Sequence, residues 1–524
     1  MRIPLRDNTV LLADLYRPDT ADRLPTAVRR TPYGRSGAPG GRSVDGLRLV
    51  RAGYNLLVQS TRGRDGSDGA FRPFATERED GADTLDWVAA QPWCDGRTAL
   101  FGRSYEGMAA LLAAPDSGCG AVAAQVAPGS RAGATRSGGA FQLGFCLHWV
   151  LCDLVLPELA AGSAAAAEVI AALDDIDRLY ADPGAALELL DRCAPYYRDW
   201  LEEPAVAEEP AAGPPLLSIG GWYDIFLADG LAARSRRPEL STLVVGPWSH
   251  CVTGGIFPQR RYGHAADEDV VDITALHIAH FDRALKGRDT APGAPVRLFV
   301  TGADEWRDFP CWPVPGTTDQ AVHLAGRGRA AEGDGRLLPE PAEPASDQLR
   351  HDPAAPVPTC GGATLMTGMF VGADCGPLDQ RDVERHPHVL RYTGDRLHRP
   401  LTVIGEVRVV LGFAATTPDA DLAAKLVDVH PDGRAELLCD GVLRARHRDP
   451  GAPAGLEPGR ITELAVRLGA VAHRFGAGHR IRLDLAASNF PRFDLDPALA
   501  AGVVGAVHHG GAHGSCLVLP VSPD

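Results

Sequence analysis

The chain has 524 residues, of which 45% are hydrophobic and 23% are charged, so it has the composition of an ordinary globular protein with about three domains or fewer large ones. A formal net charge of −15 without a prominent basic patch argues against a nucleic-acid-binding protein. No apolar run reaches the roughly 18 residues of a membrane span, and the first residues lack the order of a signal peptide, so we expect a cytoplasmic protein. The 11 cysteines include no C-x-x-C pair, which favours buried reduced thiols over a disulfide framework or a zinc ribbon.

Strand-like and helical segments alternate over the first 130 residues. Three strand-like runs, TVLLADLYRP, TAVRRTPYG and YNLLVQSTRG, precede a segment with helical spacing, EDGADTLDWVAAQ. A short apolar strand, a turn and a helix follow in RTALFGRSYEGMAALLAA. This order favours an α/β fold with a mostly parallel sheet that helices cover on both faces.

The composition changes between residues 131 and 210, which are rich in Ala, Leu and Asp and contain no strand-like run. These residues predict a helical insertion, which could be ordinary covering helices but is interpreted here as a cap that shapes a substrate pocket. The strand-like runs PPLLSIGGWYD and STLVVGPWSH follow, joined by a predicted helix over 225–237. Residues 1–130 and 211–312 are therefore expected to form one α/β core, interrupted by the cap.

The helical patterns end near residue 310. A stretch rich in Gly, Pro, Ala and Glu, 326–358, predicts an irregular linker. Short β-rich runs separated by turn signals follow, among them LTVIGEVRVVLGFAA and AELLCDGVLRAR. Residues 313–524 therefore predict a linker and a carboxyl-terminal all-β sandwich or jelly-roll domain.

Three short motifs at the ends of strand-like runs carry the main functional signal. They are GRSYEG around Ser104, GGWYD ending at Asp224 and GPWSH ending at His250. The order serine, acid, histidine is that of the α/β-hydrolase catalytic triad, in which the serine lies on a tight strand-to-helix turn. A serine hydroxyl needs a base within hydrogen-bond reach to act as a nucleophile, and an acid orients that base. The sequence therefore predicts Ser104 as nucleophile, His250 as base and Asp224 as the orienting acid.

Each triad position has rivals in the sequence. His264, His277 and His280 are alternative bases, although the last two fall in a predicted helix and fit surface or packing roles better. Asp229 is the alternative acid, and it falls within the helix after Asp224. Cys251 could pair with the adjacent His250, but neighbouring residues on one strand usually point apart.

The tetrahedral oxyanion of acyl transfer needs at least two hydrogen-bond donors. The backbone N–H of Tyr105, the residue after the nucleophile, is the first candidate. The phenol of Tyr33, in the early loop RRTPYGR, is the second, although an exposed tyrosine in a Pro/Gly turn needs no function.

The motifs together resemble the cocaine-esterase-like (CocE/NonD) hydrolases, relatives of X-Pro dipeptidyl-peptidase and of α-amino-acid ester hydrolases. The resemblance runs nearly end to end, through RTPYGR, STRGRDGSDGAF, GRSYEG, GGWYDIF, GPWSH, HFDRALKG, DQRDVE and FGAGHRIRLDLAASNFPRFD. It implies an α/β-hydrolase core, a helical cap and a carboxyl-terminal jelly roll. It also implies the triad Ser104, Asp224 and His250, with Tyr33 and the Tyr105 amide as oxyanion hole.

One departure from the relatives bears on the substrate. In α-amino-acid ester hydrolases an acidic pair soon after the catalytic aspartate helps to bind the substrate ammonium, whereas this chain reads Ile225, Phe226 and Leu227 there. A neutral or aromatic acyl group therefore fits better than a free α-amino group. Candidate pocket walls, for which core packing is the competing interpretation, are Phe141, Trp149, Trp222, Phe226 and Trp248.

The predicted function is hydrolysis of a small-molecule carboxylic ester, or less readily an amide, through an acyl-enzyme on Ser104. Three alternatives stay open: acyl transfer or related acyl chemistry in a biosynthetic pathway, an X-Pro-type or α-amino-acyl peptidase, and a non-catalytic ligand-binding protein. We expect no cofactor, no metal, no nucleic-acid partner and no membrane association, and leave a homo-oligomer open. The His-rich HHGGAH and the calcium-loop-like GRDGSDG are both interpreted as plain loops.

Overall fold

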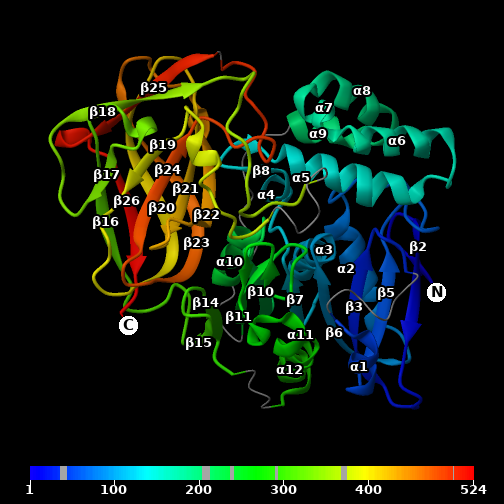
Figure 1. Ribbon diagram of the computed structural model, residues 1–524. Helices are drawn as coiled ribbons and strands as arrows, with labels where there is room; N and C mark the ends of the chain where they lie inside the picture. The colour runs from blue at the N-terminus through cyan, green and yellow to red at the C-terminus, as the bar shows by residue number, and fades with distance from the viewer. Residues whose placement is uncertain are drawn as a thin grey trace.

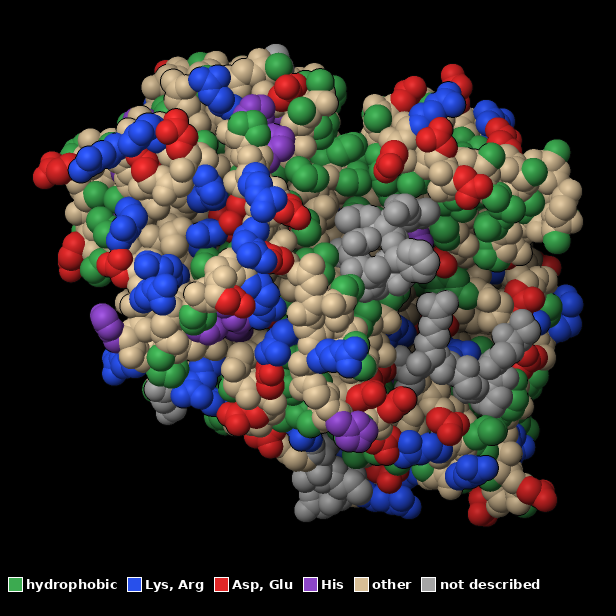
Figure 2. All heavy atoms as spheres, in the orientation of Figure 1, with side chains coloured by type: hydrophobic (Ala, Val, Ile, Leu, Met, Phe, Trp, Pro, Cys, Tyr) green, Lys and Arg blue, Asp and Glu red, His purple; other side chains and the backbone are tan. Residues whose placement is uncertain are grey.

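The computed structural model describes residues 1–35, 44–202, 213–236, 241–288, 293–366, 375–499 and 501–523. An α/β core, a helical segment and a strand-rich β domain lie side by side (Figure 1). In the same orientation, the space-filling view shows the surface indented between the β domain and the helical segment (Figure 2). None of the helices in the described ranges is both long enough and apolar enough to cross a membrane.

The α/β core is built on a ten-stranded sheet in the order β1-β2-β5-β3-β6-β7-β10-β11-β14-β15. The strands from β5 to β14 along this order are parallel, and antiparallel pairs form both edges. Their bounds are Arg2–Pro4 (β1), Val10–Tyr16 (β2), Leu24–Thr31 (β3), Asn55–Ser60 (β5), Cys94–Arg103 (β6), Ala121–Gln125 (β7), Leu216–Tyr223 (β10), Thr242–Ser249 (β11), Val296–Val300 (β14) and Glu305–Phe309 (β15).

Helices cover both faces of this sheet, which explains why its strands β7, β10 and β11 are buried along their whole length rather than at alternate residues. Buried residues of α1 (Gly46–Arg51) and α12 (Ile273–Lys286) pack on one face. Buried residues of α2 (Glu77–Ala89), α3 (Tyr105–Ala113) and α10 (Leu227–Ser235) pack on the other. The strand and helix alternation predicted from the sequence is therefore a doubly covered parallel sheet.

The helical segment, residues 131–202, is inserted between β7 and β10. It consists of α4 (Arg131–Thr135), a small hairpin of β8 (Arg136–Ser137) and β9 (Ala140–Phe141), α5 (Leu143–His148), the π-helical turn η2 (Trp149–Val155), and α6 to α9 (Ala164–Asp174, Ile176–Ala181, Pro183–Cys193 and Tyr196–Glu202). The last residues of the predicted cap, 203–210, lie outside the described part of the chain. In Figure 1 the helices α5 to α9 lie above the α/β core and beside the β domain.

The β domain holds an eleven-stranded sheet in the order β18-β25-β20-β26-β16-β17-β19-β24-β21-β22, with β23 paired to β20. All of its pairs are antiparallel except β17 with β19. The bounds are Thr318–Ala325 (β16), Gly335–Leu338 (β17), Ala345–His351 (β18), Leu390–Thr393 (β19), Leu401–Ala415 (β20), Asp421–Val429 (β21), Ala435–Arg444 (β22), Ile461–Phe475 (β23), Arg480–Ala486 (β24), Gly502–His509 (β25) and Cys516–Val521 (β26).

The prediction of an irregular linker over 326–358 is wrong, because β17 and β18 fall within it. β18 reads ASDQLRH, and only Asp347, Leu349 and His351 of it are buried. Two of these three residues are polar, so the strand carries too little apolar alternation to be recognised. Asp347 is satisfied by His509 at 2.9 Å and by the hydroxyl of Tyr392 at 2.9 Å.

Candidate active site

The turn between β6 and α3 presents Ser104 in a conformation that a non-glycine residue rarely adopts, with φ 56° and ψ −123°. A Cβ atom at Gly102 would lie 2.4 Å from the backbone carbon of Glu106. A Cβ at Gly107 would lie 2.7 Å from the Cβ of Ala127 and 2.9 Å from the carbonyl oxygen of Gly102. Both glycines of the GRSYEG motif are therefore required by the close approach of strand and helix.

Ser104, Asp224 and His250 are each the first residue after a strand of the parallel sheet, namely β6, β10 and β11. The His250 Nε2 atom lies 3.0 Å from Ser104 Oγ, and its Nδ1 atom lies 2.7 Å from Asp224 Oδ1. Asp224 is 3% exposed and His250 is 7% exposed. The structure thus brings the three predicted residues into one hydrogen-bonded chain at the carboxyl edge of the sheet, where α/β folds bind ligands.

Further contacts orient the acid and the base. The second oxygen of Asp224 accepts a hydrogen bond from the Phe226 backbone N–H at 3.1 Å. Arg103, the last residue of β6, donates a hydrogen bond to the carbonyl oxygen of His250. Because both ends of the imidazole and its backbone are fixed, its orientation does not depend on substrate.

The alternative acid, bases and thiol that the sequence offered lie outside the hydrogen-bonded chain of Ser104, His250 and Asp224. Asp229 accepts a hydrogen bond from the Gly129 N–H at 2.9 Å, and burial raises its pKa to about 6. His277 and His280 are buried under the sheet on α12, where burial lowers their pKa values to about 4 and about 3. His264 and Cys251 have exposed side chains.

The two expected oxyanion donors lie next to each other. Tyr105 is the first residue of α3, so its backbone N–H points out of the helix start. The Tyr33 ring packs edge-on against the Tyr105 ring with centroids 6.4 Å apart. The Tyr33 oxygen accepts a hydrogen bond from Trp149 Nε1 at 3.0 Å, which leaves its own O–H free to donate. Although 43% of the Tyr33 side chain is exposed, desolvation of the phenol and the charge of Asp153 raise its pKa, so it stays protonated.

The network that holds the Tyr105 side chain was not predicted from the sequence. Its hydroxyl donates to Glu77 Oε1 at 2.7 Å and accepts from the Phe74 N–H at 3.2 Å. The other Glu77 oxygen lies 2.7 Å from the Arg30 guanidinium, and both side chains are no more than 3% exposed. Burial and the Glu77 charge raise the pKa of Tyr105. Arg30 begins the RTPYGR motif, but that motif gives no indication of its contact with Glu77. Glu77 lies in no motif and meets Tyr105 only through the tertiary fold.

A cluster of aromatic side chains adjoins the triad, and we call it the aromatic wall. Trp149 stacks on Phe145 and on Trp200, with centroids 5.7 and 5.6 Å apart. Phe226 packs edge-on against both Phe145 and His250, each at 5.4 Å. Two of the predicted pocket residues, Trp149 and Phe226, therefore lie together in this wall.

The other three predicted pocket residues lie differently. Phe141 belongs to the same apolar cluster but packs deeper, against Tyr197 at 5.7 Å. Trp222 and Trp248 are not part of the wall: they pack in two other core clusters of the sheet. Their indole N–H groups donate to the carbonyl oxygens of Phe299 at 2.7 Å and Ala266 at 2.6 Å. Both indoles are thus satisfied as core residues, which corrects their placement in the pocket.

His148, at the end of α5, was not singled out by the sequence. It is 8% exposed, and burial together with the nearby His250 lowers its pKa to about 4, so it is neutral. It directly precedes Trp149 in the chain, and its imidazole is near enough to that of His250 for the two to interact electrostatically. No motif distinguishes it from a packing histidine.

Comparisons with known proteins match both the α/β part and the β domain of the chain. Residues 7–252 match the model of the X-Pro dipeptidyl-peptidase (S15) family, and residues 290–508 match the X-Pro dipeptidyl-peptidase C-terminal non-catalytic domain. The chain is 35% identical to the cocaine esterase of Rhodococcus sp. strain MB1 Bresler, over 99% of this chain and 97% of the relative. The chain belongs to the CocE/NonD family of serine hydrolases. It is an enzyme of the serine-esterase class.

Two solved structures share the whole architecture. An aminopeptidase from a marine sediment Thaumarchaeota archaeon superposes with a TM-score of 0.80 at 21% identity, covering 100% of this chain and 96% of that one. An α-amino acid ester hydrolase superposes with a TM-score of 0.75 at 21% identity, covering 99% and 96%. At these identities the likeness establishes the fold but not the substrate.

The crowding at the nucleophile turn predicts the effect of Gly107→Ala. The new methyl group would meet Ala127 and the Gly102 carbonyl, so α3 must shift and Ser104 must leave its position. We expect kcat/KM to fall by more than about 10²-fold, as a displacement of about 1 Å does in a positioned site. Gly230→Ala is the matched control, because its nearest neighbour is Ser218 Oγ at 3.4 Å. Unchanged activity in the Gly107 variant would contradict this account of the turn.

Proposed function

We propose that the enzyme hydrolyses carboxylic esters with a neutral, apolar acyl group through an acyl-enzyme on Ser104. The observation that carries the proposal is the continuous chain from Ser104 Oγ to His250 Nε2 at 3.0 Å and from His250 Nδ1 to Asp224 Oδ1 at 2.7 Å. This is the arrangement that activates a serine hydroxyl at neutral pH.

The proposed reaction has two halves. Ser104 Oγ attacks the ester carbonyl carbon while His250 Nε2 takes the hydroxyl proton, and Asp224 stabilises the resulting imidazolium. The Tyr105 N–H and the Tyr33 O–H donate to the tetrahedral oxyanion. The C–O bond to the leaving alcohol then breaks, and the proton on His250 passes to that alcohol. In the second half a water molecule attacks the acyl-enzyme with the same proton transfers, and the carboxylic acid leaves.

The surroundings of the triad support an apolar acyl group. Ile225, Phe226 and Leu227 follow Asp224 directly, and Phe226 packs on the imidazole of His250. A cavity of about 890 Å³ lies near the aromatic wall; no triad residue lines it, and charged side chains such as Arg64 and Glu158 lie among its apolar ones. Its lining includes Phe71, whose ring is 6.2 Å from that of Tyr105, and Tyr196, 5.3 Å from Trp200.

The first test is intact mass after treatment with a small fluorophosphonate. We expect one covalent adduct on the wild-type enzyme and none on Ser104→Ala, because only a deprotonated serine oxygen attacks phosphorus rapidly. Ser130→Ala is the matched control, because Ser130 is a buried serine that caps α4 and should leave the adduct intact. An adduct that persists in Ser104→Ala on a folded protein would remove Ser104 as the nucleophile.

The second prediction concerns the acyl group and the acceptor. In a panel of matched aryl, alkyl and α-amino esters, together with an X-Pro amide, we expect the highest kcat/KM for esters without an α-ammonium group. A charged ammonium group would be desolvated beside Phe226 without a carboxylate at 225–227 to pair with it. Product partition with added alcohols or amines measures transfer against hydrolysis. A preference for α-amino esters or X-Pro amides would contradict the proposed substrate class.

Tyr33→Phe tests the oxyanion hole without removing the ring. Loss of the O–H should lower kcat by about 10²–10³-fold, with a smaller change in KM, because the donor acts mainly on the transition state. Tyr54→Phe is the control, since Tyr54 is a buried tyrosine that donates to Asp282 at 2.6 Å on the α12 side of the sheet. If the two variants have equal kcat values, Tyr33 is not an oxyanion donor.

A further inference from the structure

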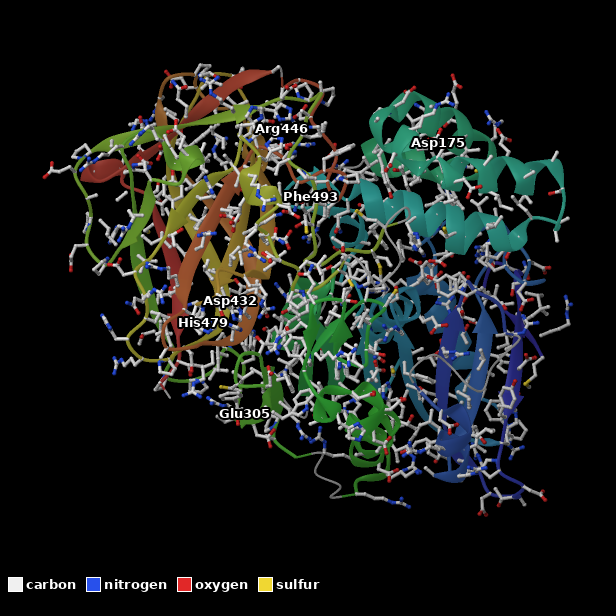
Figure 3. All side chains as sticks on the ribbon, in the orientation of Figure 1. Asp175, Glu305, Asp432, Arg446, His479 and Phe493 are labelled. Atoms are coloured by element: carbon white, nitrogen blue, oxygen red, sulfur yellow. The ribbon has the colours of Figure 1, made fainter. Side chains whose placement is uncertain are left out.

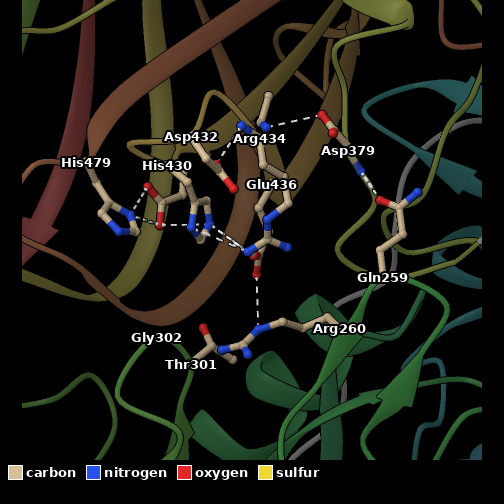
Figure 4. Close-up of polar contacts among 12 residues, drawn as sticks. Gln259, Arg260, Thr301, Gly302, Asp379, His430, Asp432, Arg434, Glu436 and His479 are labelled. Carbon is tan, nitrogen blue, oxygen red and sulfur yellow. Dashed lines mark hydrogen bonds and ion pairs between the residues drawn. The ribbon is translucent and has the colours of Figure 1, made fainter.

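A second group of chemically active side chains lies in the β domain, away from the triad residues. Asp428 is near the end of β21, His430 begins the following turn, and His479 immediately precedes β24. In Figure 3, Asp432 of the same turn and His479 lie together at the end of the β domain nearest Glu305 of the α/β core. Figure 4 shows His430 and His479 facing each other across this turn.

The three side chains offer one ligand atom each, and these atoms all lie within 4.8 Å of one another. His479 Nδ1 lies 2.9 Å from both oxygens of Asp428, and His430 Nε2 lies 3.8 Å from Asp428 Oδ2. Ligands about 2.0–2.1 Å from a tetrahedral zinc ion lie about 3.4 Å apart. The two donor distances to Asp428, 2.9 and 3.8 Å, lie on either side of this spacing.

Two residues behind the group hold Asp428 in place. His473 Nε2 lies 3.1 Å from Asp428 Oδ2, and its Nδ1 atom lies 2.8 Å from the hydroxyl of Thr301, which follows β14. His473 is 2% exposed, whereas the His430 and His479 side chains are 22% and 19% exposed. A buried partner that orients a carboxylate, behind two imidazoles open to solvent, is the layout of an accessible metal site with an ordered second layer.

The side chains in direct contact with this group include more carboxylates than guanidinium groups. Asp428 and Glu436 are buried carboxylates, and Asp304, with 32% of its side chain exposed, is a third carboxylate in contact with the same arginine network. Arg260 pairs with Asp304 at 2.7 Å and approaches Glu436 at 3.7 Å. Arg434 is the second guanidinium in direct contact with these carboxylates, so in this contact network three carboxylates meet two guanidinium groups when the histidines are neutral. Arg336, Arg396, Arg480 and Arg482 line a pocket that also includes His430.

Arg434 occupies the side of the group that a metal ion would need. Its guanidinium lies 2.6 Å from Glu436 Oε2 and 2.9 Å from His430 Nε2 (Figure 4). The side chain is 25% exposed and belongs to a turn, so it can move into solvent. Its departure would free His430 Nε2 and leave Glu436, 3.2 Å from that atom, as a further ligand.

We infer that Asp428, His430 and His479 form a binding site for a Zn²⁺ ion, with Arg434 as the internal cation that the metal displaces. Two imidazoles and one carboxylate suit zinc better than calcium or magnesium, which prefer oxygen ligands. The ion would join the β21–β22 turn to the segment before β24. Through Asp428 and His473 it would also brace the contact with Thr301 of the α/β core.

The test is calorimetric titration of the full chain with Zn²⁺, after chelator treatment. We expect one dominant site in the wild type, and binding weakened by more than about 10²-fold in His430→Ala and in His479→Ala. His398→Ala, an exposed histidine of the same domain, should bind as the wild type does. Arg434→Gln should bind Zn²⁺ more tightly, because it removes the competing charge. Zn²⁺ should also raise the thermal unfolding midpoint of the wild type but not of His430→Ala.

An anomalous difference map from a crystal grown with Zn²⁺ locates the ion independently of the variants. A peak among Asp428, His430 and His479 supports the site even if a variant folds poorly. A map whose peaks lie only at other histidines, or wild-type binding that His430→Ala and His479→Ala leave unchanged, would overturn it. Weaker binding in Arg434→Gln would overturn the role given to Arg434.

Discussion

The strained turn at Ser104 is the constraint on which the active site depends. A non-glycine residue at φ 56° costs about 1–3 kcal/mol, so surrounding contacts must hold it there. The Ser104 N–H donates to the Gln125 carbonyl at 2.9 Å, and the Gln125 side chain donates to Glu268 at 2.8 Å. Glu268 lies 3.8 Å from Arg103, which in turn binds the His250 carbonyl. The contacts that hold the nucleophile turn therefore also hold the base.

The helical segment does more than cover this site. Its π-helical turn begins at Trp149, whose indole N–H fixes the Tyr33 oxygen and whose ring stacks in the aromatic wall. A phenol that accepts from an indole can donate only in the remaining direction, so the cap determines where the Tyr33 proton points. The candidate oxyanion hole is thus assembled from an early loop, the helix after the nucleophile and an insertion, three segments that are distant in sequence.

The sequence was sufficient to find Ser104, Asp224 and His250 because each follows an apolar strand and parallel strands end at one edge of the sheet. It did not reveal Glu77 or His148, whose roles come only from tertiary neighbours. It misplaced Trp222 and Trp248, because a tryptophan beside a catalytic motif looks the same whether its indole faces a pocket or a backbone carbonyl. The linker prediction was wrong for a related reason: β18 is held by the buried carboxylate of Asp347 rather than by apolar residues.

The β domain contributes no residue to the Ser104–His250–Asp224 chain, yet it constrains the site through buried charge. Asp494 accepts from the Phe141 N–H of the helical segment at 2.8 Å and pairs with Arg444 at 3.0 Å. Arg444 also pairs with Asp421 at 2.9 Å and Asp496 at 3.6 Å. In Figure 3, Arg446 and Phe493 mark this side of the β domain, facing the helices. Buried ion pairs add little net stability, because desolvation offsets their attraction, but a misaligned pair leaves a charge unpaired at a cost of about 3–5 kcal/mol.

Such contacts therefore fix the orientation of the β domain against the helical segment and add little to the net stability. The N–H of Gly144, the second residue of α5, donates to the Pro491 carbonyl at 3.0 Å, so the same β-domain loop fixes the start of the helix that leads to Trp149. A shift of the β domain would displace α5, then Trp149, and then the Tyr33 phenol that Trp149 holds. The position of a proton donor in the α/β core thus depends on how a domain without triad residues is seated against the cap.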